Sequence, residues 1–79
     1  MGGEHQKERR EIPIRGEMIR LGQLLKLAGA VHAGGELREF LAQTTVLVGG
    51  EPETRRGRQL HPGDSVELAD EVLVVVGSQ

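Results

Sequence analysis

Cysteine, tryptophan and tyrosine are absent from this sequence of 79 residues, and phenylalanine occurs once. Without cysteine the chain can form neither a disulfide nor a thiolate metal site, and this absence is typical of proteins from a reducing compartment. The shortage of aromatic side chains removes the stacking platforms that proteins use to read unpaired bases. Any contact with nucleic acid should therefore be made to phosphates and to duplex shape.

Long hydrophobic runs are also missing. No segment approaches the roughly 18 apolar residues that a membrane-spanning helix needs. Residues 1–10 are charged and have no apolar segment behind them, unlike a secretory signal. The sequence therefore predicts a soluble cytoplasmic protein that makes no contact with a membrane.

The length of the chain, 79 residues, leaves room for one small domain. Residues 1–10 carry both charge signs and lack any apolar period, so ordering them would bury too little apolar surface to offset the lost entropy. We expect a disordered tail over residues 1–10 and a single domain over residues 11–79.

Residues suited to catalysis or metal binding are few and scattered. His5, His32 and His61 show no ligand spacing with one another or with acidic residues, so ordinary exposed histidines are expected. Ser65 and Ser78 are the only serines, and neither stands in a nucleophile motif. A domain of this size also has little volume for a closed pocket. We therefore expect no enzymatic activity, no metal, no cofactor and no small-molecule substrate.

Apolar residues at helical spacing predict two helices in the first half of the chain. Leucines and alanines recur at i, i+3, i+4 and i+7 over residues 19–28, with Met18 one turn earlier and Gly29 as a stop signal. A shorter stripe predicts a second helix over residues 36–43. Gly34 and Gly35 stand just before it and leave its first backbone N–H groups accessible, which is a place where phosphate can bind.

After residue 43 the apolar period changes from about 3.6 to about 2, which predicts strands. Gly49-Gly50 follows a β-branched apolar run and is typical of a hairpin turn, with residues 51–55 as a returning strand or extended loop. Further strands are expected over residues 65–68 and 71–76, and residues 11–15 should form an edge strand because Pro13 lacks a donor.

These elements predict an α+β domain of two helices followed by a small, mainly antiparallel sheet. Its core should bury the apolar positions of both helices and of the strands that follow them. Most of the core should come from Leu21, Leu24, Leu25, Leu37, Phe40, Leu41, Val46, Val48, Leu60, Val66 and Leu68.

The charges are unevenly distributed, although the formal net charge is only −2 at pH 7. Residues 55–58 hold three arginines and no acid, whereas the chain from residue 64 onward holds acids and neither lysine nor arginine. The local field governs phosphate binding more than the net charge does, and the planar guanidinium suits phosphate oxygens. Arg20 and Lys26 add basic groups on one face of the first predicted helix. The arginine-rich segment and the pair on the helix are also compatible with a surface that only contacts solvent.

Five segments, taken in order, carry a family resemblance. They are RLGQLLK at residues 20–26, AGGELR at 33–38, VLVGGE at 46–51, ETRRGR at 53–58 and PGDSV at 62–66. Over residues 19–68 the chain resembles the S4 RNA-binding domain. The segments LGQLLKL and ETRRGR are most similar to the small, free-standing bacterial S4 proteins.

The resemblance implies two helices packed against a β-hairpin, which recognise structured RNA, ribosomal or transfer, through its backbone. It also implies ribosomal proteins as possible partners. The chain departs from the family at Gly49, where asparagine is usual, and at Gly34, where many members carry a basic residue. The resemblance and the charge pattern together give the candidate RNA-binding residues Arg20, Gln23, Lys26, Gly35, Arg38, Gly49, Gly50, Arg55, Arg56 and Arg58.

Two other functions fit parts of the sequence. A β-grasp sulfur carrier would share the small size and the Gly-Asp at residues 63–64, but it needs a C-terminal Gly-Gly, whereas this chain ends Val-Gly-Ser-Gln. A β-grasp chain also begins with a hairpin, whereas here the predicted helices come first. A protein-docking module without RNA binding could instead use the acidic C-terminal strands to hold a basic partner.

Overall fold

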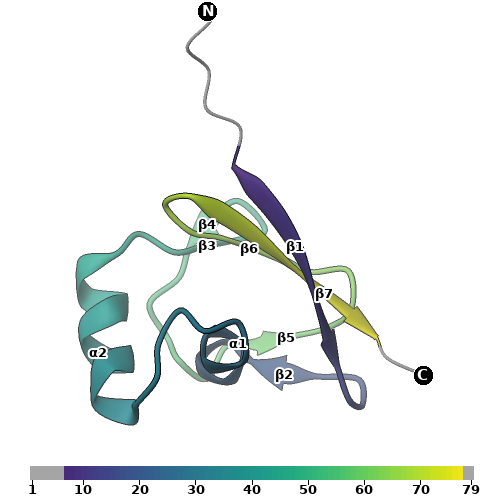
Figure 1. The fold of residues 1–79 in the computed structure, drawn as a ribbon, viewed down its shortest axis with the longest axis horizontal. Coiled ribbons are helices and arrows are strands. Elements are labelled where there is room, and N and C mark those ends of the chain that lie inside the picture. The colour runs from purple at the N-terminus through teal and green to yellow at the C-terminus, as the bar shows by residue number, and fades with distance from the viewer. Residues whose placement is uncertain (1–6, 78–79) are drawn as a thin grey trace, which may run out of the picture.

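The computed structural model describes residues 7–77, which form two helices and seven strands in an α+β arrangement (Figure 1). The elements in chain order are β1 (Glu8–Ile14), β2 (Ile19–Arg20), α1 (Leu21–Leu27), α2 (Gly34–Gln43), β3 (Leu47–Val48), β4 (Glu51–Pro52), β5 (Gln59–Leu60), β6 (Ser65–Glu67) and β7 (Glu71–Gly77).

The main sheet has five strands in the order β1-β7-β6-β3-β4. The pairs made by β7 with β6, β6 with β3 and β3 with β4 are antiparallel, whereas β1 runs parallel to β7, with Ile12 opposite Val75. A second, two-stranded sheet joins β2 to β5. The prediction of a small sheet following the helices was therefore incomplete. A strand before the helices pairs with the last strand, and such a long-range parallel pairing leaves no local signal in the sequence.

The position of β1 confirms one prediction and shifts another. β1 is an edge strand, as Pro13 indicated. It begins at Glu8, however, so it includes the end of the predicted tail, while residues 1–6 lie outside the described residues. The backbone ladder with β7 orders Glu8 and its neighbours in spite of their low apolar content. Ion pairs from Lys7 to Glu67 and from Arg10 to Glu71 strengthen this edge.

Helix α1 is shorter than predicted. Ile19 and Arg20 are extended and belong to β2, with Ile19 opposite Leu60, so the helix begins at Leu21. Met18 precedes this strand and is 38% exposed instead of lying on a buried helical stripe. Helix α2 begins at Gly34, earlier than predicted, and ends at Gln43 as expected.

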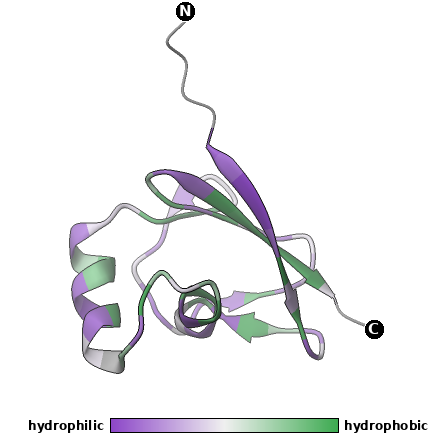
Figure 2. Cartoon of the chain, viewed as in Figure 1, coloured by the Kyte–Doolittle hydropathy of each residue, from purple (hydrophilic) through white to green (hydrophobic). Residues whose placement is uncertain are grey.

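One hydrophobic core joins both helices to the sheet, and Figure 2 shows green segments on α1, α2 and β7, which supply many of its side chains. All the predicted core residues are buried except Phe40, which is partly buried and packs against the others. The rest of the core, which the prediction did not list, comes from β1, from β7 and from the segment that follows α1. These additional core residues are Ile12, Ile14, Ala28, Val31, Leu73 and Val75.

The turn between β3 and β4 is the predicted hairpin. Gly49 and Gly50 have φ of 59° and 88°, the left-handed conformation that a two-residue type I′ turn requires at both positions. Val48 faces Glu51 directly across the turn. The left-handed region is disfavoured for any residue with a Cβ, which explains why glycine occupies both positions.

We expect Gly50→Ala to lower the free energy of unfolding by about 1 kcal/mol, because alanine at this φ is strained even though the space around it is open. Gly35→Ala is the matched control. Gly35 lies in the first turn of α2 with no atom within 4 Å of an added Cβ, so alanine there should stabilise by about 0.5–1 kcal/mol. Urea denaturation of both variants checks the pair, and equal effects would contradict the turn assignment.

Candidate nucleic-acid interface

The arginine-rich segment is anchored to the start of α1 by its own backbone. The N–H of Leu21 donates to the carbonyl oxygen of Arg58 at 2.8 Å, and the N–H of Gly22 donates to that of Arg56 at 2.9 Å. The first N–H groups of a helix have no partner inside the helix, so these carbonyls satisfy them. We call residues 53–58 the arginine loop. At Arg56 and Arg58 its backbone is held by α1.

A close approach between the two helices completes this anchor. A Cβ added at Gly22 would lie 2.8 Å from Cδ2 of Leu37 in α2 and 3.5 Å from the carbonyl oxygen of Arg56. Leu37 is only 1% exposed. Glycine at position 22 therefore lets α1, α2 and the arginine loop meet at one point.

Arg20 and Gln23 lie at the start of α1, beside the arginine loop. The Nη1 group of Arg20 donates to the carbonyl oxygen of Gly57 at 3.4 Å, so this side chain reaches across to the arginine loop. The Oε1 atom of Gln23 accepts a bond from the N–H of Arg20 at 3.3 Å and helps to cap α1. Arg20 thus has both a structural contact and an exposed surface.

Glu53 organises the arginine loop, and its carboxylate is 7% exposed. Its Oε2 atom accepts bonds from the backbone N–H groups of Thr54 and Arg55, at 3.1 and 3.0 Å, and from Nε of Arg55 at 3.1 Å. Its Oε1 atom accepts from Nη2 of Arg55 at 3.3 Å and from Nη1 of Arg58 at 2.9 Å. One buried carboxylate therefore holds two of the three arginines.

These bonds lower the pKa of Glu53 from 4.5 to about 2, chiefly through the side-chain bond from Arg55, with the Arg55 backbone and Arg58 adding to it against the effect of burial. The same side-chain bond raises the pKa of Arg55. Because the folded-state pKa is depressed, the carboxylate stabilises the fold above pH 4.5 and loses this contribution as the pH falls toward 2.

The pH dependence gives a prediction. At about 1.4 kcal/mol for each pKa unit, the charge of Glu53 contributes up to about 3 kcal/mol near neutral pH. The difference in free energy of unfolding between the parent and Glu53→Gln should therefore be constant above pH 4.5 and shrink as the pH falls toward 2. Urea denaturation at a series of acidic pH values measures it, and a difference independent of pH would contradict the assigned role.

Two open hollows flank the arginine loop. One, of about 300 Å³, lies between the loop and α2 and is lined by Arg38, Leu41, Thr54 and Arg56. The other, of about 530 Å³, is lined by Arg55, Gly57, Arg58, Gln59 and His61. The arginines of the loop thus line hollows on both of its sides, and Arg38 of α2 shares the first hollow with Arg56.

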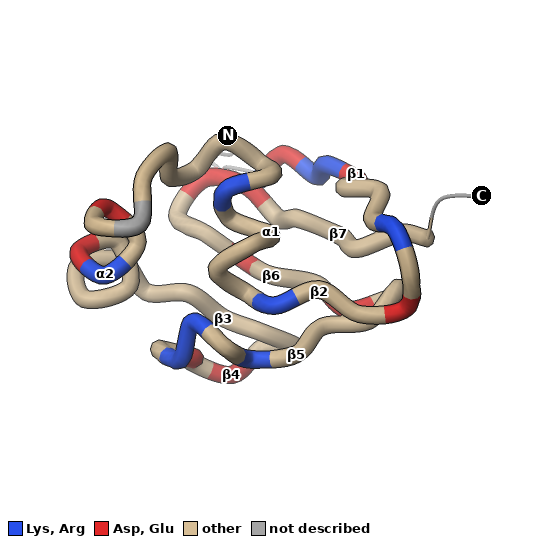
Figure 3. The backbone as a smooth tube through the Cα atoms, turned by 90° about the horizontal axis from the view of Figure 1, so that it is seen from below, with Lys and Arg blue, Asp and Glu red and all other residues tan. Residues whose placement is uncertain are grey.

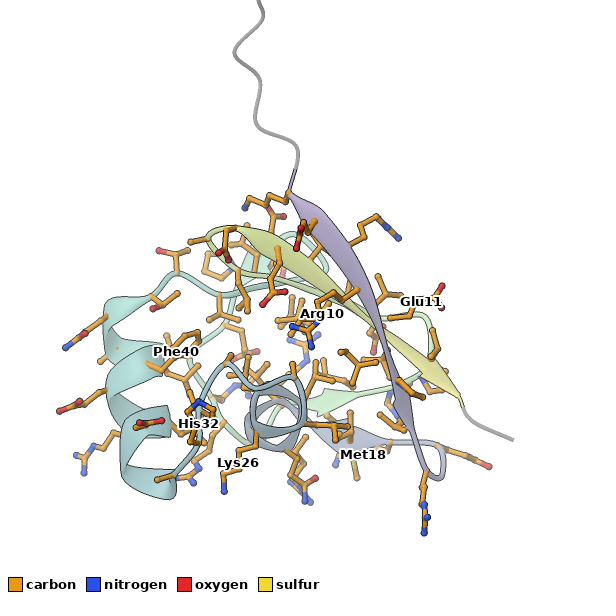
Figure 4. All side chains as sticks on the ribbon, viewed as in Figure 1. Arg10, Glu11, Met18, Lys26, His32 and Phe40 are labelled. Atoms are coloured by element: carbon orange, nitrogen blue, oxygen red, sulfur yellow. The ribbon has the colours of Figure 1, made fainter. Side chains whose placement is uncertain are left out.

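Lys26 extends this basic surface along α1. It lies in the last turn of the helix, and Figure 4 shows its side chain pointing away from the main sheet. Seen from below in Figure 3, the basic segments of α1, of α2 and of the loop after β4 lie around one face of the molecule. We call the surface of these three segments the basic face. Within it, Arg20 donates to the arginine loop and Arg38 lines a hollow with Arg56, whereas Lys26 lies in the last turn of α1.

The glycine candidates lie elsewhere. Gly49 and Gly50 form the tip of the hairpin, whereas the arginine loop follows its other end, where the N–H of Glu53 donates to the carbonyl oxygen of Val46 at 2.8 Å. Gly35 lies in the first turn of α2. There the Glu36 carboxylate accepts a bond from the N–H of His32 at 2.7 Å, so a negative charge already stands beside this helix start.

Three of the acids from residue 64 onward have partners at the N-terminal edge of the sheet or in their own turn. Glu67 pairs with Lys7 and Glu71 pairs with Arg10, whose other Nη group bonds the carbonyl oxygen of Ala28. Figure 4 shows Arg10 reaching from β1 toward α1. Asp64 accepts a bond from the N–H of His61 at 2.7 Å. These contacts leave fewer free carboxylates for a basic protein partner than the sequence suggested.

Two features are absent from the described part of the chain. Between residues 7 and 77 no cluster of three or more histidines, cysteines, aspartates or glutamates is arranged to hold a metal ion. No helix in the same range is long and apolar enough to cross a membrane.

Sequence reasoning missed Glu53 as a functional residue. Its signal was present, because an acid two and five residues before arginines can bond both in a tight loop. Acids at a strand edge are usually solvated, however, and the burial that gives this one its role comes from the tertiary fold.

Comparison with known proteins adds two findings. The sequence model of the S4 domain family matches residues 12–76. A protein of Bacillus subtilis (strain 168), described as "Probable ribosome maturation protein RlbA", is 53% identical over 57 residues, which are 72% of this chain and 80% of that protein.

Proposed function

This chain belongs to the S4 domain family, and from that premise we propose that it is an RNA-binding module that holds structured RNA by its phosphate backbone. The observation that carries the proposal is the anchoring of the arginine loop to α1. It holds the loop beside α1, and Arg38 of α2 lines a hollow together with Arg56 of the loop. A surface of this kind binds phosphates with little regard to sequence.

The residues that we propose as contacts differ in their support. Arg20, Lys26, Arg38 and the arginines of the loop come from the three segments of the basic face. Gln23 lies beside them at the start of α1. Gly35, Gly49 and Gly50 lie apart from the arginine loop, and we propose them only as outer contacts of an extended RNA through their exposed backbone.

Ribosomal RNA is the partner that we propose. The Bacillus relative is described as a probable ribosome maturation protein, and this chain is more than half identical to it over most of both lengths. Transfer RNA is the next candidate, and ribosomal proteins could lie beside the bound RNA. The proposed role is binding in the cytoplasm, without catalysis, a cofactor or a small-molecule substrate.

Crosslinking in the native cell, followed by sequencing of the attached RNA, tests this function. We expect reads concentrated in structured segments of ribosomal RNA, and their loss when Lys26 and Arg56 are replaced by glutamate. Enrichment of proteins without RNA would instead favour the docking function. Reads spread evenly over messenger RNA would contradict a ribosomal partner.

A further inference from the structure

The three arginines of the arginine loop are not equivalent. Arg55 and Arg58 each donate to the buried carboxylate of Glu53. Among residues 7–77, no ion pair involves Arg56 or Arg38. The charges of Arg55 and Arg58 are thus partly compensated inside the protein, whereas those of Arg56 and Arg38 are exposed and uncompensated.

Arg38 and Arg56 face one hollow. Together with Leu41 and Thr54 they line the open space of about 300 Å³ between α2 and the arginine loop. Two guanidinium groups that share a hollow without a counter-charge repel each other, and an anion between them relieves this repulsion. The threonine at the rim adds a hydroxyl that can donate to an anion.

The backbone on each side of this hollow is held by contacts within the protein. On the loop side, the carbonyl oxygen of Arg56 is fixed by the N–H of Gly22 at 2.9 Å. On the helix side, Arg38 follows Leu37, which packs at the close approach of α1 to α2. The backbone positions of both arginines are therefore set before any ligand binds, which lowers the entropic cost of binding.

We propose that this hollow is a binding site for one phosphate of the RNA backbone, held jointly by Arg38 and Arg56, and that Arg55 and Arg58 serve mainly to position the loop through Glu53. The inference rests on the proposed function and refines it. The three arginines of the loop then have different roles. Arg56 binds phosphate together with Arg38, whereas Arg55 and Arg58 position the loop.

Single and double substitutions test the site. Binding of Arg38→Gln, Arg56→Gln and the double variant to a fluorescent ribosomal RNA hairpin is measured by anisotropy at several salt concentrations. Each single change should weaken binding on the order of tenfold, and the double variant should lose less than the product of the two. The slope of log affinity against log salt should flatten by about one in the double variant, because the protein then neutralises one phosphate fewer.

Arg9→Gln is the control, since Arg9 is an exposed arginine on β1, and it should change the affinity by less than about twofold. Thermal unfolding should be unchanged in all the variants, because the anchor at Arg56 uses its backbone. Losses that multiply, with a slope flattened by two, would mean separate phosphates and would overturn the inference. Unchanged affinity, in a parent that binds RNA, would overturn it as well. A parent that fails to bind RNA would instead overturn the proposed function, and the site with it.

Discussion

Glu53→Gln is expected to lower the free energy of unfolding by about 2–3 kcal/mol. The substitution keeps the size of the side chain and removes its charge, leaving Arg55 and Arg58 without their carboxylate. An amide has one oxygen and an NH₂ group that cannot accept, so it cannot receive all five bonds that Glu53 accepts. The expected loss is below the 3–5 kcal/mol typical of a fully buried pair, because the arginines are partly exposed.

The matched control is Glu51→Gln. Glu51 lies two residues earlier on β4 and is exposed, so its replacement should change the free energy of unfolding by no more than about 0.5 kcal/mol. Denaturation in urea at neutral pH compares the two variants with the parent. A Glu53→Gln protein as stable as the parent would contradict the role assigned to this carboxylate.

The same substitution separates two ideas about RNA binding. Removing a negative charge from a basic surface should tighten binding if only the net charge matters. We expect weaker binding instead, because the loop loses the bonds that hold Thr54 and Arg55 in place. Tighter binding by Glu53→Gln, with the fold intact, would show that the loop does not need its carboxylate.

Lys26→Glu combined with Arg56→Glu is expected to weaken binding to a structured RNA by about a hundredfold or more, at about tenfold for each lost contact. Lys26 lies in the last turn of α1 and Arg56 in the arginine loop, so the pair tests two separate segments of the basic face. The slope of log affinity against log salt should flatten by about two. Arg55 is unsuitable for this test, because glutamate there would place a second carboxylate beside Glu53.

The control for this variant is Arg9→Glu, which changes the net charge as much as either single reversal but lies on β1. Its effect on affinity should stay within about threefold, from the general field alone. Anisotropy with the same RNA measures all the variants, and circular dichroism checks their folds. An equal loss from the control would mean that total charge, and not the basic face, governs binding.

The parts of the fold that the sequence predicted are those with local signals. The type I′ turn could be predicted because Gly49-Gly50 between apolar residues has few other uses. The edge position of β1 followed from Pro13. The parallel pairing of β1 with β7 could not be predicted, since it joins the two ends of the described chain and depends on the packing of Ile12 and Ile14. The start of α1 was misplaced because Ile19 continues the apolar stripe yet pairs with Leu60.

Some features of the candidate site could likewise be predicted from the sequence, and others depend on the tertiary fold. A dense run of arginines on one segment is visible in the sequence, and so is a basic face on a helix. The arginine loop lies beside α1 because the carbonyl oxygens of Arg56 and Arg58 cap this helix. No sequence pattern predicts such a cap. The special role of Glu53 depends on its burial, and the apposition of Arg38 and Arg56 depends on the close approach at Gly22.

The most direct measurement is the salt dependence of the parent protein's affinity for a ribosomal RNA hairpin and for an unstructured strand of equal length. If about four phosphates are neutralised by the basic face, log affinity should fall with log salt at a slope of about −3 to −4. The hairpin should bind more tightly than the strand, because the surface has no tyrosine or tryptophan on which to stack unpaired bases. An affinity that does not change with salt, or a preference for the unstructured strand, would contradict binding through the phosphate backbone.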